Sequence, residues 1–252
     1  MLKEQVKKHN FGLIGKDISY SFSKQYFTDK FNALNLNDYS YQNFDLQQIE
    51  EFHDIIKNTI NLKGLNVTIP YKEEIIDFLD EIDPIARNIG AVNTIKILDN
   101  NRLKGFNTDV YGFENSLKPL LKEVHKKALI LGTGGASKAI NFVLNKLKIE
   151  TLFVSRNSDG QDKIAYHNLS KSIIREHTII VNCTPLGTYP DVDRYPNIPY
   201  QYLTSKHLLF DLIYNPAESN FLKKGKEMGC TFKNGLQMLQ LQAEKSWEIW
   251  TR

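Results

Sequence analysis

Short apolar segments alternate with segments of helical periodicity along the chain, and this alternation restricts its fold more than any other feature. In the second half, an apolar run at 127–132 (KALILG) leads into a stretch at 133–147 whose apolar residues recur at helical spacing. Further strand-like runs follow at 150–156, 178–183 and 207–214. Near-continuous apolar strands separated by helices are typical of parallel sheets that helices cover on both faces. This half therefore predicts a doubly wound parallel sheet.

The first half shows the same alternation, so the chain predicts two α/β domains. We expect a first domain over 1–108, which a C-terminal helix at 233–252 rejoins, and a second domain over 109–232. Phe27, Phe31 and Leu34 should form the buried face of one helix. The other expected elements are strands at 11–15, 39–44 and 62–69, helices at 24–34, 46–58, 72–82, 110–124, 216–229 and 236–250, and a hairpin turning at Asp99-Asn100-Asn101.

Charge and composition exclude several classes of protein. The chain has 252 residues, a net charge of +3 and no long basic run, which argues against a nucleic-acid partner. Cys183 and Cys230 are its only cysteines, which indicates a reducing compartment. Neither they nor the six histidines have metal-ligand spacing, so no metal is expected. Without a signal peptide or a membrane-spanning stretch, we expect a soluble, cytoplasmic protein with no membrane partner.

A glycine-rich loop joins the strand at 127–132 to the helix that follows. Gly132 permits a tight turn, and Gly134 and Gly135 let the backbone approach a pyrophosphate at the helix N-terminus. Ser137 stands where the dinucleotide-binding motif has its third glycine, but the flanking strand and helix are the context that the motif requires. We predict a dinucleotide site, with a glycine-rich turn that binds nothing as the alternative.

The end of the next strand predicts which dinucleotide binds. An acidic residue there would bond a ribose hydroxyl and favour NAD, whereas this chain has Ser155, Arg156 and Asn157. The planar guanidinium of Arg156 suits a 2′-phosphate, so we predict NADP. The alternative is an exposed arginine on a βα loop without a ligand, because the nearby Asp159 makes the distinction between NADP and NAD less sharp.

Polar residues near strand ends of the first half predict a second site. Pro70 has no N–H to give a sheet and should end the strand near Ile69, so that Thr68 and Lys72 enter the site. The alternative is a solvated lysine in the first turn of a helix.

Four more polar residues in this half have both a functional and a structural interpretation. Ser21 and Ser23 precede a helix, where two hydroxyls would hold a small carboxylate. Ser23 could instead act only as the N-cap. Asn93 and Asp109 stand at the two ends of the hairpin, and either could be an ordinary turn residue.

Taken together, the sequence resembles the shikimate dehydrogenases from about Phe11 to Trp247. That family combines an α/β substrate domain with a Rossmann domain and has its active site in the cleft between them, so the resemblance implies the same arrangement here. The motifs that carry the resemblance are YSFSK, NVTIPYK, GAVNT, GFNTD, GTGGAS, NCTPLG, DLIYNP and GLQMLQLQA.

The resemblance also implies roles for individual residues. Lys72 and Asp109 match the family's catalytic pair. The residues that match its substrate site are Ser21, Ser23, Thr68, Asn93, Asp109, Tyr214 and Gln242. The residues that match its NADP site are Gly132, Thr133, Gly134, Gly135, Ala136, Ser155, Arg156, Asn157, Asn182, Thr184, Ile213 and Gly235.

The implied reaction is the reversible reduction of 3-dehydroshikimate to shikimate by NADPH. The alternatives are a quinate dehydrogenase, a dual quinate/shikimate dehydrogenase, or a non-catalytic regulator that binds NADP. A small-molecule substrate is expected as the partner, and the chain is expected to be a monomer or a homodimer.

Overall fold

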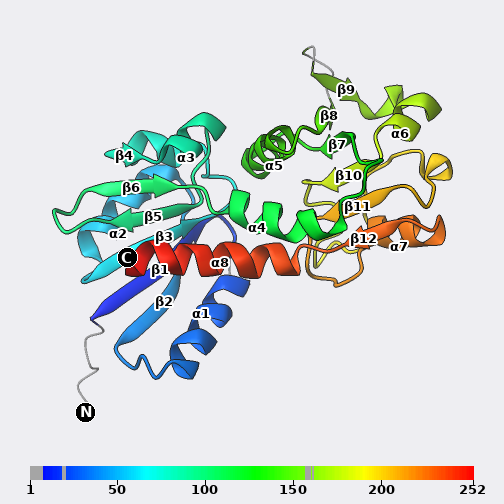
Figure 1. The fold of residues 1–252 in the computed structure, drawn as a ribbon. Helices are drawn as coiled ribbons and strands as arrows, with labels where there is room; N and C mark the ends of the chain where they lie inside the picture. Colours follow the sequence, from blue (N-terminus) through cyan, green and yellow to red (C-terminus); the bar gives the residue numbers. More distant parts are fainter. Residues whose placement is uncertain (1–7, 19–20, 157–159, 161) are drawn as a thin grey trace. The chain divides into compact units, whose positions relative to one another are not determined.

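The computed structural model describes residues 8–18, 21–156, 160 and 162–252, which fold into two compact units (Figure 1). The chain leaves the first unit after Thr108 and returns to it at Ala243, and the second unit is Asp109–Gln242. The return lies inside the last helix, α8 (Leu236–Thr251), ten residues after the expected residue 233. The first turns of α8 therefore group with the second unit.

The first unit is built on a six-stranded mixed sheet in the order β2-β1-β3-β5-β6-β4. Strand β1 is parallel to β2 and β3, whereas β5 is antiparallel to β3 and β6. The predicted hairpin is confirmed, since β5 and β6 pair across it. The strands are β1 (His9–Gly15), β2 (Tyr39–Asp45), β3 (Leu62–Val67), β4 (Glu81–Ile82), β5 (Thr94–Ile97) and β6 (Leu103–Phe106).

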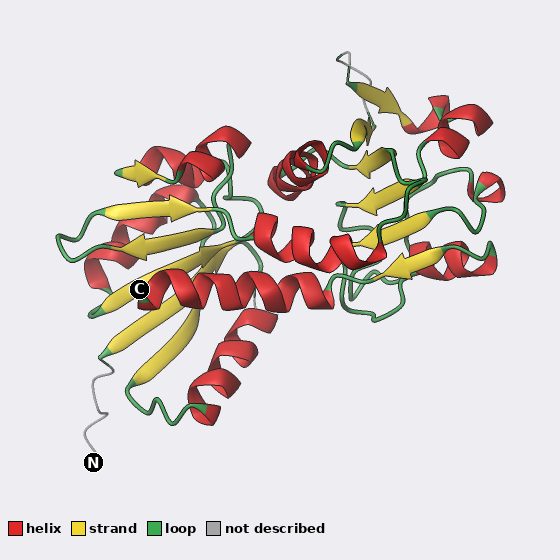
Figure 2. Cartoon of the chain, viewed as in Figure 1, coloured by secondary structure: helices red, strands yellow, loops and turns green. Residues whose placement is uncertain are grey.

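Each sheet carries helices on both faces (Figure 2). In the first unit, α1 (Phe22–Ala33) and the end of α8 cover one face, where Phe27 and Trp250 pack against Phe11. The helices α2 (Phe52–Asn58) and α3 (Pro84–Ile89) cover the other face.

Trp250 approaches the sheet at Gly64, where an added Cβ would lie 2.2 Å from the indole nitrogen. The same nitrogen donates a hydrogen bond to the carbonyl oxygen of Ile95, at 2.9 Å. Glycine at position 64 therefore lets the last helix pack directly on the sheet.

The second unit is a six-stranded, wholly parallel sheet in the order β12-β11-β10-β7-β8-β9. This is the strand order of the dinucleotide-binding doubly wound fold, with its switch point between β7 and β10. All carboxyl ends lie at one edge of the sheet. The elements are α4 (Asp109–Leu117), β7 (Lys127–Leu131), α5 (Gly135–Lys146), β8 (Glu150–Ser155), β9 (Lys163–Ala165), α6 (Lys171–Glu176), β10 (Ile179–Asn182), β11 (Leu208–Asp211), α7 (Asn220–Glu227) and β12 (Thr231–Lys233).

The structure corrects three expectations about single elements. The helix expected at 72–82 is wrong, because this stretch forms a short 3₁₀ helix (Glu74–Phe78) and then β4, which pairs with β6. Leu34 is 52% exposed, since α1 ends one residue before it. The helix expected at 110–124 ends at Leu117, and Pro119 follows in a 3₁₀ turn.

Candidate functional site

The glycine loop of the second unit lies at the switch point of its sheet. Gly132 follows β7 with φ +104°, a conformation that favours glycine. A Cβ there would lie 3.2 Å from Cγ2 of Thr184, so the turn fits closely against the end of β10. Gly134 is the N-cap of α5, and beyond its two chain neighbours no atom of the described residues lies within 4 Å of where its Cβ would be. The loop therefore leaves room for a ligand at the N-terminus of a twelve-residue helix without acidic residues in its first turn.

Ser137 replaces the third glycine without leaving a buried polar atom unpaired. Its side chain is fully buried, and its hydroxyl donates to the carbonyl oxygen of Gly134, at 2.6 Å. The replacement is therefore compatible with the close packing of helix and strand that this position requires.

The predicted 2′-phosphate contacts follow β8. Ser155 is the last residue of this strand, and Arg156 is exposed directly after it. Asn157 and Asp159 lie outside the described residues. Burial raises the pKa of the nearby Tyr166 phenol to about 12, while the charge of Arg156 acts in the opposite direction.

Asn182 and Thr184, predicted on the nicotinamide side, belong to a buried network at the ends of β10 and β11. The Asn182 amide donates to Oδ1 of Asp211 (3.0 Å) and accepts from the backbone N–H and the hydroxyl of Thr184 (3.0 and 2.7 Å). Asp211 also accepts from Ser219 and from the Ile213 N–H. The amide nitrogen and the amide oxygen of Asn182 thus both form hydrogen bonds within the protein. This indicates that the side chain holds the backbone that follows β10 in place.

Sequence reasoning missed Asp211 and Ser219. The available signal was an acidic residue at the end of a buried strand, in the DLIYNP motif. Burial raises the pKa of Asp211 to about 6, although its three hydrogen-bond donors lower it.

Asp109 opens α4 and is almost completely buried. A carboxylate is favourable at a helix N-terminus. Burial is the main cause that raises the pKa of the Cys183 thiol, and the charges of Asp211 and Asp109 add to it. The Asp109 carboxylate therefore lies near the end of β10, at the edge that carries Asn182 and Thr184.

The remaining predicted residues of the second unit lie on two segments. Gly235 donates its N–H to the carbonyl oxygen of Ile213, at 3.0 Å, so these two neighbours in space border the same edge. Tyr214 directly follows Ile213 and is half-buried. Gln242 lies on α8 and is buried.

In the first unit, Ser23 does not have the capping role that the sequence left open as an alternative. Ser21 is the N-cap of α1 but makes no capping bond, and its buried Oγ has no hydrogen-bond partner in the part of the chain that is described. Ser23 lies inside the first turn and is buried, so the alternative that it is the N-cap is wrong. A buried hydroxyl without a partner is costly, which fits a ligand site at Ser21.

Thr68, Lys72 and Asn93 come together at the carboxyl end of β3. The Thr68 N–H donates to Ile14 of β1, at 2.9 Å. The backbone carbonyl oxygen of Asn93 accepts from the Val67 N–H at 2.9 Å. The backbone carbonyl oxygen of Lys72 accepts from the N–H of Val92, the residue before Asn93, at 2.7 Å. The strand stops at Val67, slightly before the expected Ile69, and these hydrogen bonds place the backbones of the three residues near its end.

Lys72 belongs to the first unit and Asp109 begins the second. Each is described within its own unit, so their convergence on one substrate stays a prediction.

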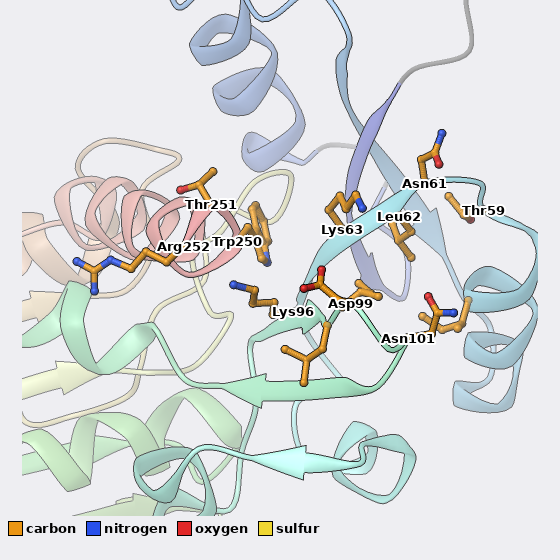
Figure 3. A pocket seen from close by; sticks show the side chains of 13 residues that line it. Thr59, Asn61, Leu62, Lys63, Lys96, Asp99, Asn101, Trp250, Thr251 and Arg252 are labelled. Carbon is orange, nitrogen blue, oxygen red and sulfur yellow. The ribbon is translucent and has the colours of Figure 1, made fainter.

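A pocket of about 810 Å³ lies elsewhere in the first unit (Figure 3). Lys63 of β3, Lys96 of β5, Asp99 of the hairpin turn and Trp250 of α8 line it. It contains none of the predicted site residues. Among the described residues, no three His, Cys, Asp or Glu side chains form a group suited to a metal, and no helix has the length and apolar character to span a membrane.

Fold and site together define a class of protein. A parallel sheet with a glycine loop at its switch point is a Rossmann-like domain, here joined to a second α/β unit. This is the plan of a two-domain oxidoreductase that uses a nicotinamide dinucleotide.

Comparison with known proteins identifies the family. The family model of the shikimate dehydrogenase substrate binding domain matches residues 13–95. The shikimate dehydrogenase (NADP(+)) of Methanosphaera stadtmanae is 39% identical, over 95% of this chain and 90% of that protein. The chain belongs to the shikimate dehydrogenase family of oxidoreductases, which act on a CH–OH group, and the curated relatives that it matches are named as NADP(+)-dependent.

Solved structures support the same family assignment. Shikimate dehydrogenase 1 of Peptoclostridium difficile is 40% identical with a TM-score of 0.84, covering 96% of this chain and 91% of that one. The shikimate 5-dehydrogenase of Thermus thermophilus, solved with NADP(H) and shikimate, is 30% identical with a TM-score of 0.84, covering 96% and 93%.

Proposed function

We propose that this chain catalyses the reversible, NADPH-dependent reduction of 3-dehydroshikimate to shikimate, in the pathway to chorismate and the aromatic amino acids. The observation that carries this proposal is the similarity to shikimate dehydrogenases over 95% of the chain. The Rossmann-like order of the second sheet and its open glycine loop support it independently.

The second unit is the proposed NADP domain. The pyrophosphate binds at Gly132–Ala136, because the N–H groups of the first turn of α5 are available there. Ser155, Arg156 and Asn157 hold the 2′-phosphate, with Arg156 as the main donor. Asn182, Thr184, Ile213 and Gly235 border the nicotinamide. When bound, the cofactor supplies the hydride, and the protein supplies orientation and charge.

The first unit is the proposed substrate domain. Ser21 and Ser23 bind the substrate carboxylate together with Tyr214. The Ser21 hydroxyl supports this assignment, because it has no hydrogen-bond partner in the described part of the chain. The ring hydroxyls are bound by Thr68, Asn93, Asp109 and Gln242. Asn93 can only donate to them, because its amide oxygen already accepts hydrogen bonds from Thr94 and Thr108.

Lys72 and Asp109 are the proposed catalytic pair. As hydride reaches the ketone carbon, negative charge develops on the oxygen and a proton must follow. The Lys72 ammonium stabilises that charge and gives the proton, and in the reverse direction its amine accepts the proton from the alcohol. Asp109 orients the ammonium and accepts a hydrogen bond from the neighbouring substrate hydroxyl.

The alternatives receive less support. A quinate or dual quinate/shikimate dehydrogenase is not favoured, because the curated relatives are named as shikimate dehydrogenases (NADP(+)). A non-catalytic regulator would be expected to lack one member of the Lys72–Asp109 pair, and both are present.

The test follows the loss of NADPH absorbance on addition of 3-dehydroshikimate, and the reverse reaction with shikimate or quinate and with NADP or NAD. Turnover that is fastest with shikimate and NADP is expected. NADPH binding without turnover of either acid would favour the regulator. We expect a cytoplasmic monomer or homodimer, and sedimentation measures the oligomeric state.

A further inference from the structure

Three buried hydroxyls meet behind the proposed substrate site of the first unit. Thr94 starts β5, Thr108 follows β6, and Ser246 lies on α8; all three are at most 1% exposed. The oxygen–oxygen distances are 2.8 Å (Thr94–Ser246), 3.1 Å (Thr94–Thr108) and 3.2 Å (Thr108–Ser246). We call these three residues the hydroxyl cluster. Since its members are far apart in sequence, only the tertiary fold creates it.

The hydroxyl cluster fixes the orientation of the Asn93 amide. Oδ1 of Asn93 faces the Thr108 N–H at 2.7 Å, the Thr108 hydroxyl at 3.2 Å and the Thr94 hydroxyl at 3.1 Å. A backbone N–H can only donate, so the atom that faces it must be the amide oxygen. The Asn93 amide nitrogen consequently points away from the cluster and makes no hydrogen bond within the described residues.

Asn66 connects Ser246 to the same group. Its amide nitrogen lies 2.9 Å from the Ser246 hydroxyl, 3.2 Å from the Thr94 hydroxyl and 3.3 Å from the Asn93 carbonyl oxygen. Its amide oxygen accepts from the Tyr41 hydroxyl at 2.8 Å. Ser246 thus offers the nearest acceptor to Asn66 and the nearest hydroxyl to Thr94. Without it, both lose their shortest contact in the cluster.

We propose that Ser246 is a positioning residue for substrate binding: from the C-terminal helix, it completes the hydroxyl cluster that turns the Asn93 amide nitrogen toward the substrate. This inference rests on the proposed function, because it takes Asn93 as a ligand of the substrate hydroxyls. Ser246 acts through its hydrogen bonds with Thr94, Thr108 and Asn66. The C-terminal helix is accordingly part of the substrate site and more than a cover for the sheet.

The test is a double-mutant cycle of Ser246→Ala and Asn93→Ala. Ser246→Ala should raise KM for the substrate about three- to tenfold, the equivalent of one net hydrogen bond, and leave KM for NADP(H) unchanged. In the Asn93→Ala background, the same substitution should have almost no further effect on the substrate KM, because the group that Ser246 positions is gone. Equal effects in both backgrounds, or an unchanged KM in Ser246→Ala, would overturn the proposal.

Ser116→Ala is the matched control. Ser116 is also buried on a helix, but its hydroxyl donates to the carbonyl oxygen of Phe113 in the same helix and has no other hydrogen bond within the described chain. It should lower thermal stability as Ser246→Ala does and leave both KM values unchanged. If Ser246→Ala does not fold, Thr94→Val removes a hydroxyl of the same cluster with nearly the same shape and must show the same dependence on Asn93. The parent enzyme's turnover tests the proposed function separately, so the two failures are distinguishable.

Discussion

Single side chains at strand ends carry the proposed chemistry. Lys72 follows β3 and is half-buried, with its backbone fixed by the hydrogen bond to Val92. A lysine held in this way has fewer orientations than a solvated one, which suits a group that must reach one substrate oxygen.

Lys72→Ala should lower kcat about 10²- to 10⁴-fold, the usual effect of losing an acid–base group, and leave the Kd for NADPH nearly unchanged. Steady-state rates and fluorescence titration with NADPH measure the two quantities. Lys63→Ala is the control, because Lys63 lies in the pocket that contains no predicted site residue. Turnover of Lys72→Ala within a few-fold of the parent would remove Lys72 from the mechanism.

Arg156→Ala should weaken NADPH binding about tenfold or more and change NADH binding little, because only NADPH carries the 2′-phosphate. Titrations with both dinucleotides provide the measurement. Arg175→Ala, an exposed arginine on α6 of the same unit, should affect neither. Equal weakening of both dinucleotides contradicts the assignment.

At the scale of the element, the pH dependence of stability should come from the ends of β10 and β11. Asp211 has a pKa of about 6 in the folded protein, against an ordinary value of 3.8. A raised folded pKa means that the folded state binds the proton more tightly. The stability that this carboxyl contributes is therefore complete below pH 3.8 and lost as the pH rises through about 6.

Asp211→Asn should abolish this loss, which amounts to about 2–3 kcal/mol. The variant keeps one oxygen for Ile213 and Asn182 but replaces the oxygen that accepts from Ser219 with an NH₂ group, so it should be less stable than the parent at low pH, with the difference shrinking between pH 4 and pH 7. Urea unfolding across this range gives both free energies. A constant difference would show that Asp211 does not titrate in this window.

The elements also show where sequence patterns suffice. The glycine loop and its flanking elements were predictable because a buried parallel strand, a tight turn and a helix start each have a local signature. The stretch at 72–82 was not predictable in the same way. Its end pairs with β6, where Glu81 and Ile82 lie opposite Lys104 and Gly105, and this distant partner overrides the local helical pattern.

At the scale of the whole molecule, the chain crosses between its units twice, and the last helix returns to the first. Trp250 links this helix to α1 and to the sheet, through contacts with Phe11 and Phe27 and the hydrogen bond to Ile95. The end of the chain is therefore part of the core of the first unit.

Trp250→Ala should lower the free energy of unfolding by about 3–5 kcal/mol, the cost of a large buried aromatic side chain. NADPH binding under native conditions should change little, because the proposed cofactor residues belong to the second unit. Denaturant unfolding and NADPH titration test both statements. Phe232→Ala, at a partly exposed aromatic on β12, should cost less than about 1 kcal/mol. A similar cost for both variants would contradict this role of Trp250.

The sequence by itself determined the class of fold, the glycine loop and the family, because these depend on local periodicity and on motifs whose members are close in the chain. It also identified Asn93 and Lys72 as candidates for the site. The tertiary structure alone revealed the Ser21 hydroxyl that has no hydrogen-bond partner among the described residues, the network around Asp211 and the hydroxyl cluster of Thr94, Thr108 and Ser246. Hydrogen bonds depend on distances of about 3 Å between groups that can be more than a hundred residues apart, and no local pattern encodes such distances.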